Sequence, residues 1–258
     1  MTVDETPPST NAVSETTNGS APKTTTAANG EFWIFGYASL IWKPPPHFDR
    51  RVPGWVTGYV REVGAFTIIF FCCHDAMMHL GVLTPLSSED HRGTPEAPGR
   101  VATLIERSFW ATLTDSHDSA FDEKVWGVAY RIDAAHAAEV RAYLDIREIN
   151  GYTIHYTPFY PAADGARPFQ TMAYIGTPEN PQFTGPQDVQ KLAAHIFAST
   201  GPSGPNRDYL WGLEQALNEL SPASGDVHVT DLSDRVRAMA AEAAEADGAT
   251  VKEAKTET

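Results

Sequence analysis

The stretch FWIFGYASLIW, residues 32–42, carries most of the information about the fold. Its first five residues, Phe32–Gly36, form a short apolar run that ends in glycine, which is typical of a buried strand. Backbone N–H groups exposed at the tip of such a strand bind a carboxylate or an oxyanion. From this pattern alone an ordinary tight turn is the simpler interpretation.

Further strands are expected downstream of this run, and most helices are expected late in the chain. We expect strands at 55–61, 101–106, 125–132, 152–159 and 169–175. We expect helices at 134–148, with Asp133 as N-cap, and at 187–199, 207–220 and 232–246. Strands first and helices later predict an α+β fold with an antiparallel or mixed sheet, not a doubly wound parallel one.

The composition describes an acidic globular protein. The 258 residues carry a formal net charge of −14, and 42% of them are hydrophobic. An acidic chain repels phosphate backbones, so a nucleic-acid partner is not expected. Cys72 and Cys73 are the only cysteines, and their adjacency argues against a disulfide framework and for a reducing compartment.

The N-terminal 30 residues differ in composition from the rest. Residues 1–30 are rich in Ser, Thr, Asn, Ala and Pro, so we expect a disordered tail. A transit peptide would be rich in Arg and poor in acids, whereas this tail has Asp4, Glu5, Glu15 and no Arg. Without a signal peptide or a long apolar run, the expected location is cytoplasmic, with no membrane partner.

Several common functional motifs are absent from the sequence. Neither GxGxxG nor GxxxxGK[ST] occurs, so nucleotide cofactors receive no support, and no GxSxG motif indicates a serine hydrolase. A metal site can be imagined from Cys72, Cys73, His74 and His79. Adjacent side chains on a strand point to opposite faces, so we expect no metal there.

Two other segments carry chemically useful side chains. YLDIREINGY, residues 143–152, places Glu148 at the end of a helix with an apolar inner face. Partial desolvation would make Glu148 a usable base, although a surface ion pair with Arg147 is slightly favoured on physical grounds alone. DHRGTPEAPGR, residues 90–100, is a turn-rich loop with two arginines, which suit a substrate carboxylate but also a plain polar loop.

Taken together, six segments of the chain resemble a known family. They occur in register between about residues 32 and 220: FGYASLIW, DHRGTPEAPGR, VWGVAYRI, YLDIREINGY, YIGT with Asn180, and GPSGPNRDYL. In this order they resemble the ChaC-type glutathione-specific γ-glutamylcyclotransferases. The resemblance implies a mixed β-barrel with flanking helices, the γ-glutamylcyclotransferase-like fold, over residues 31–222. A C-terminal helix and acidic tail would then occupy residues 223–258.

The resemblance also implies an activity and its residues. Family members are lyases that convert glutathione to 5-oxoproline and cysteinylglycine, with no metal or organic cofactor. Glu148 matches the family's catalytic glutamate, a general acid and base. The family's substrate-binding loop maps onto Ile34, Phe35, Gly36, Tyr37, Ala38, Ser39 and Leu40. We expect glutathione as the small-molecule substrate and a monomeric protein.

Two departures from the family pattern stand out. Ala38 occupies a position where glycine is common, which would strain the backbone if that position had positive φ. A family strand of the type RFWQ is absent after Arg61, and an apolar stretch at about 62–88 replaces it. This stretch is either an intron or gene-model error read in frame, or a genuine insertion whose FTIIFF segment supplies the strand.

The sequence is consistent with three hypotheses for the function. The leading one is the glutathione-specific enzyme. The alternatives are a cyclotransferase for other γ-glutamyl peptides or amines, and a non-catalytic γ-glutamyl-peptide binding module or an isoform inactivated by the insertion. Four further side chains are candidates for the pocket without an assigned role: Arg92, Arg100, Tyr130 and Tyr143.

Overall fold

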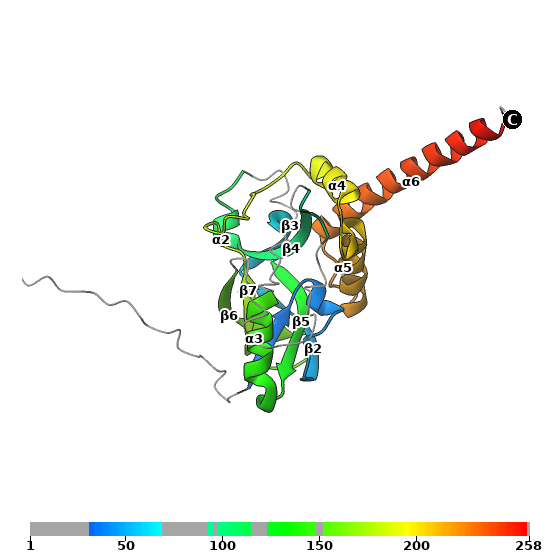
Figure 1. The fold of residues 1–258 in the computed structure, drawn as a ribbon. Helices are drawn as coiled ribbons and strands as arrows, with labels where there is room; N and C mark the ends of the chain where they lie inside the picture. Colours follow the sequence, from blue (N-terminus) through cyan, green and yellow to red (C-terminus); the bar gives the residue numbers. More distant parts are fainter. Residues whose placement is uncertain (1–30, 69–91, 95–96, 115–122, 148–151, 257–258) are drawn as a thin grey trace, which may run out of the picture.

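A computed structural model of the chain shows a barrel of strands flanked by helices (Figure 1). It describes residues 31–68, 92–94, 97–114, 123–147 and 152–256. The N-terminal segment 1–30, expected to be disordered, lies outside this described part.

Five strands close into a barrel in the order β1-β5-β2-β6-β7. They are β1 (Phe32–Gly36), β2 (Phe48–Thr57), β5 (Lys124–Ile132), β6 (Thr153–Pro161) and β7 (Phe169–Ile175). Neighbouring strands run antiparallel except β1 and β7, which close the barrel in parallel. The expected mixed barrel of an α+β fold is therefore confirmed.

A second, two-stranded sheet packs beside the barrel. Strand β3 (Tyr59–Ile68) pairs antiparallel with β4 (Gly99–Glu106). The expected single strand at 55–61 is wrong, because Gly58 adopts a φ of +84° and separates β2 from β3. A glycine tolerates this left-handed conformation at little cost, so the chain leaves one sheet and enters the other there.

The strand β3 continues beyond Arg61. In residues 62–68, Glu62 lies opposite Thr103 and Thr67 lies opposite Arg100. The sequence FTI at 66–68 forms the end of this strand, and the two hypotheses on the origin of the 62–88 stretch stay predictions. The remainder of the stretch, with Cys72, Cys73, His74 and His79, lies outside the described residues.

Helix α3 (Ala137–Arg147) crosses the barrel beside β5 (Figure 1). A 3-10 turn, η3 (Ala134–His136), precedes it, and the Asp133 carboxylate accepts a hydrogen bond from the Ala135 N–H at 2.9 Å. Asp133 is therefore the N-cap that the sequence predicted. Val140 and Leu144 of α3 are fully buried in the main core.

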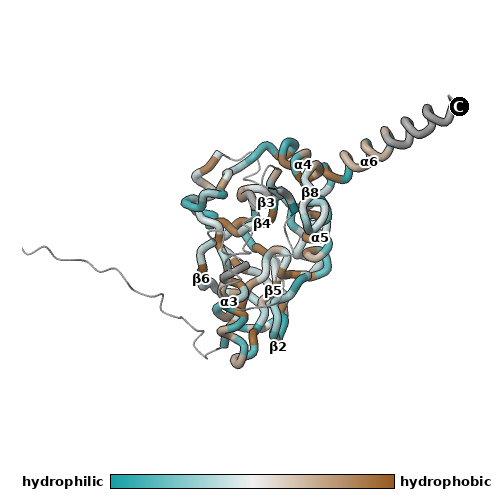
Figure 2. Tube along the Cα trace, in the orientation of Figure 1, coloured by the Kyte–Doolittle hydropathy of each residue, from teal (hydrophilic) through white to brown (hydrophobic). Residues whose placement is uncertain are grey.

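Three long helices gather on the side of the β3–β4 sheet (Figure 1). They are α4 (Val189–Ala198), α5 (Asn206–Leu220) and α6 (Val227–Thr256). The first turns of α6 carry hydrophobic residues where the helix joins the body, and its later turns project away (Figures 1 and 2). Val229, Leu232 and Val236 are fully buried in the same core as the barrel. The start of the expected C-terminal segment 223–258 is thus an integral part of the domain.

Several short elements lie between these strands and helices. They are η1 (Ser39–Ile41), α2 (Arg107–Trp110), β8 (Thr200–Gly201) and β9 (Gly204–Pro205). Within the described ranges, no helix combines the length and apolar character needed to cross a membrane.

Candidate active site

The predicted substrate-binding loop lies at the end of the first barrel strand. Ile34, Phe35 and Gly36 finish β1, and Ser39 and Leu40 open η1. Of the seven loop residues, all except Ala38 are buried. A Cβ atom at Gly36 would lie 2.7 Å from the Leu40 Cβ, so the tight return of the chain requires glycine at this position.

Three buried side chains hold this loop in one conformation. The Arg61 Nε donates a hydrogen bond to the Tyr37 carbonyl at 3.0 Å, and the Tyr37 hydroxyl donates to the Tyr174 carbonyl at 2.9 Å. The Tyr130 hydroxyl donates to the Leu40 carbonyl at 2.9 Å. Burial raises the pKa of Tyr130, so its hydroxyl stays protonated and available as a donor. The loop is therefore fixed before any ligand binds.

Ala38 does not adopt the left-handed conformation that would require glycine. Its φ is −131° and its ψ is −134°, far from the left-handed region. The strain that would arise from a positive φ at this position is therefore absent.

Replacing Ala38 by glycine tests this interpretation. Because Ala38 has a negative φ, Ala38→Gly should leave activity unchanged and lower the free energy of unfolding by about 0.5–1 kcal/mol, through the greater freedom of glycine in the unfolded chain. Urea unfolding and turnover on the same preparation measure both quantities. A marked gain in stability would show that alanine is strained here, and a marked loss of activity would show that its methyl group is part of the pocket.

Arg61 connects the loop to the start of α6. Besides the Tyr37 carbonyl, its guanidinium donates to the Trp126 carbonyl and, at 2.8 Å, to the Asp226 carboxylate. Arg61 is only 2% exposed. The sequence analysis missed this role because Asp226 lies 165 residues further along the chain and no motif contains both residues.

A second buried pair lies next to Arg61. The His228 Nε2 lies 3.3 Å from the Glu62 Oε2, and both residues are 4% exposed. Burial lowers the pKa of His228, but the nearby Glu62 and Asp226 carboxylates outweigh it and raise the pKa to about 9. The nearby carboxylates thus favour the imidazolium form of His228, and its contact with Glu62 ties α6 to β3.

This pair should make stability depend on pH. The pKa of His228 rises from an ordinary value of 6.5 to about 9 on folding, so its stabilising contribution is complete below about pH 6.5 and disappears as the pH rises through 9. The free energy of unfolding should therefore be lower at about pH 9.5 than at about pH 6, and His228→Gln should reduce this difference. Urea unfolding at the two pH values measures it. Equal pH dependence in both proteins would contradict the assignment.

Arg100, the last residue of the 90–100 segment, helps to hold β4 against α5. The Arg100 N–H donates to the Asn206 Oδ1, and the Asn206 Nδ2 donates to the Arg100 carbonyl, both at 2.8 Å. The Tyr209 hydroxyl accepts from the Ala102 N–H at 3.0 Å. Asn206 and Tyr209 belong to the GPSGPNRDYL motif, which therefore has an architectural role that the sequence analysis did not assign.

Among the described residues, the side chains of Arg92 and Arg100 make only long hydrogen bonds. The Arg92 Nη1 donates to the Pro205 carbonyl and the Arg100 Nη1 to the Pro98 carbonyl, each at 3.3 Å. Burial lowers the pKa of Arg100, and no carboxylate of the described ranges forms an ion pair with it. A carboxylate ligand for these arginines remains a hypothesis.

The predicted catalytic residue, Glu148, lies outside the described residues. Two described residues flank it in the chain. Leu144 of α3 is fully buried in the main core, and the Tyr152 hydroxyl lies 2.9 Å from the Thr103 Oγ1 of β4. Tyr143, another pocket candidate, is half-buried against the main core. The role of Glu148 stays a prediction.

Comparison with solved structures defines the class of this fold. A crystal structure described as a γ-glutamyl cyclotransferase specific to glutathione from yeast matches with a TM-score of 0.64 and 33% identity. The match covers 81% of this chain and 99% of that chain. A closed barrel whose first strand ends in a braced loop is, on this evidence, a γ-glutamylcyclotransferase-type domain.

Sequence relatives define the family. A glutathione-specific gamma-glutamylcyclotransferase of Schizosaccharomyces pombe is 40% identical over 83% of this chain and 96% of its own length. Glutathione-specific gamma-glutamylcyclotransferase 1 of Homo sapiens is 33% identical over 80% of this chain and 79% of its own length. The chain belongs to the ChaC-like protein family, whose model matches residues 32–68 and 84–239.

The family match also corrects the limits of the insertion. Residues 62–68 match the family and form the end of β3, and the match resumes at residue 84. The unmatched stretch is therefore 69–83, shorter at both ends than the 62–88 expected from the sequence.

Proposed function

We propose that this protein cleaves glutathione to 5-oxoproline and cysteinylglycine by internal cyclisation of the γ-glutamyl group. The observation that carries the proposal is the buried loop at the end of β1, which Arg61, Tyr37 and Tyr130 hold in one conformation. Relatives that align over most of their length and are named for this activity support it.

The reaction is an exchange of one amide bond for another. The α-amine of the γ-glutamyl residue attacks its own γ-carbonyl carbon, a five-membered lactam closes, and the bond to the cysteine nitrogen breaks. Because attack is intramolecular, the protein mainly has to fold the γ-glutamyl arm into the reacting geometry. The exchange is internal, so it consumes neither water nor a redox equivalent.

In our proposal Glu148 transfers protons, and the loop binds the substrate. Glu148 accepts a proton from the attacking amine and returns one to the departing cysteine nitrogen. Backbone N–H groups of residues 34–40 hold the α-carboxylate and stabilise the oxyanion that develops on the γ-carbonyl oxygen. A loop that is already fixed is suited to this task, because it need not reorganise when charge develops.

The test is release of 5-oxoproline from glutathione by the purified chain, with γ-glutamylalanine as the comparison substrate. We expect turnover of glutathione and much slower turnover of the dipeptide. Preference for the dipeptide would favour a cyclotransferase of other γ-glutamyl compounds. Binding of glutathione by a folded protein that releases no product would favour a binding module.

A shortened variant tests whether the unmatched stretch affects activity. It lacks residues 69–83 but keeps residues 62–68, because these belong to β3. Turnover by both proteins would show that the insertion is tolerated. Turnover by the shortened protein alone would show that the insertion inactivates this chain.

A further inference from the structure

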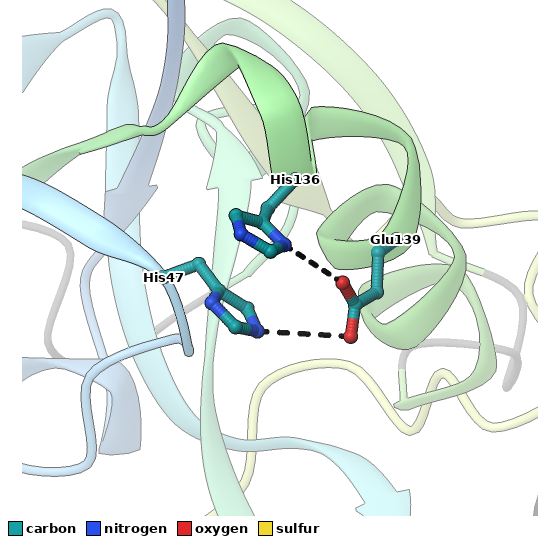
Figure 3. A group of neighbouring side chains, drawn as sticks. All are labelled: His47, His136 and Glu139. Atoms are coloured by element: carbon teal, nitrogen blue, oxygen red, sulfur yellow. Dashed lines mark hydrogen bonds and ion pairs between the residues drawn. The ribbon is translucent and has the colours of Figure 1, made fainter.

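Two imidazoles and a carboxylate converge at the start of α3 (Figure 3). The His136 Nδ1 lies 3.0 Å from the Glu139 Oε2, and the His47 Nε2 lies 3.6 Å from the Glu139 Oε1. The two rings stack with centroids 3.9 Å apart and planes 6° from parallel. Both rings therefore direct a nitrogen toward the same carboxylate.

This cluster lies away from the loop assigned to glutathione. In the pairing of β1 with β5, Gly36 at the loop end lies opposite Val128, whereas Phe32 lies opposite Ile132. The cluster follows directly after Ile132, so it sits at the other end of β1, about 13 Å away along the strand. The proposed reaction therefore does not account for these three side chains.

The backbone places the cluster in a defined geometry. His47 has a φ of 57°, the only positive φ of a non-glycine residue within the described ranges. Its carbonyl accepts a hydrogen bond from the Asp133 N–H at 3.1 Å, and the His136 N–H donates to the Asp133 carbonyl at 2.9 Å. A left-handed histidine held in place by its neighbours is a feature that often marks a functional site.

The three side chains form a donor set suited to a transition metal. Their ligand atoms all lie within 4.8 Å of one another. Metal–ligand bonds of about 2.0–2.2 Å require ligand atoms at most about 4.4 Å apart. Binding therefore requires the two stacked rings to turn out of their parallel arrangement, so that both nitrogen lone pairs point at one ion. All three groups are at least partly exposed, so an ion can reach them from solvent.

We propose that His47, His136 and Glu139 bind a divalent ion of the zinc class and so clamp the segment before β2 to the start of α3. Two imidazole nitrogens and one carboxylate oxygen favour zinc, nickel or copper over magnesium or calcium, which prefer oxygen ligands. Three protein ligands leave a coordination position for water, as in exchangeable zinc sites.

The experiment is a zinc titration of the tag-free full chain against a chromophoric chelator, with thermal unfolding as a second readout. Because Cys72, Cys73, His74 and His79 are rival ligands, the background carries serine at both cysteines and glutamine at both histidines. We expect one ion per chain, a higher unfolding temperature with zinc, and no competition from excess magnesium.

The variants His47→Asn, His136→Gln and Glu139→Gln test the three ligands. Asparagine is chosen at position 47 because it tolerates a left-handed backbone. Each change should weaken zinc binding by more than about 100-fold, since loss of even an outer-shell partner costs about 10–100-fold. The matched control is His155→Gln, a histidine that lies 3.7 Å from Glu106 and outside the cluster. Zinc binding as tight in His47→Asn as in the parent, or equal loss in the control, would overturn the proposal.

Discussion

Replacing Glu148 by glutamine is expected to slow 5-oxoproline release from glutathione by about 10²–10⁴-fold while glutathione still binds. Glutamine has nearly the same shape as glutamate but cannot take a proton from the attacking amine. The α-amine of glutathione is mostly protonated at neutral pH, so without a base its nucleophilic form is scarce. Steady-state release of 5-oxoproline measures the rate, and calorimetry measures binding.

The control for this variant is Glu242→Gln, which removes an exposed carboxylate from the projecting part of α6. It removes the same charge and should keep the parent rate. A rate for Glu148→Gln close to that of the parent would exclude Glu148 from proton transfer. Loss of glutathione binding together with turnover would instead assign Glu148 to substrate positioning.

The bounds of a strand could be predicted where a residue such as glycine marks its end in the sequence. Phe32–Gly36 was predicted with its bounds, because an apolar run ends at a glycine. The segment 55–61 failed because its apolar content runs across Gly58, where a positive φ divides β2 from β3. Composition alone does not show whether a glycine weakens a strand or ends it.

The site was predictable only in part, for a physical reason. The loop Ile34–Leu40 is contiguous, so a single motif identifies it. The side chains that hold it are those of Arg61 in β3, Tyr130 in β5 and Tyr37 in the loop itself, and Tyr37 bonds to a backbone carbonyl of β7. These groups become neighbours only when the barrel closes. The clamp formed by His47 and His136 is likewise a product of pairing between β2 and β5, since Phe48 lies opposite Ile132.

Replacing Arg61 by methionine should destabilise the protein by about 3–5 kcal/mol. The guanidinium binds the Tyr37 carbonyl, the Trp126 carbonyl and the Asp226 carboxylate from a site that is 2% exposed. Methionine fills similar volume but donates no hydrogen bond. Two carbonyls then lose a donor, and the Asp226 carboxylate, whose side chain is 17% exposed, loses its cation.

The size of this loss of stability distinguishes a buried arginine that binds several groups from an exposed ion pair. Arg235→Met serves as the control, because Arg235 pairs with Asp231 on α6 where both side chains are 35% exposed, and it should cost less than about 1 kcal/mol. Urea unfolding measures the free energies of unfolding. The Michaelis constant for glutathione reports whether the loop keeps its conformation. Arg61→Met should raise that constant, because the Tyr37 carbonyl is part of the loop that we propose binds the substrate. Equal losses in the two variants would show that the Arg61 network contributes no more than a surface pair, and that the loop owes its conformation to Tyr37 and Tyr130.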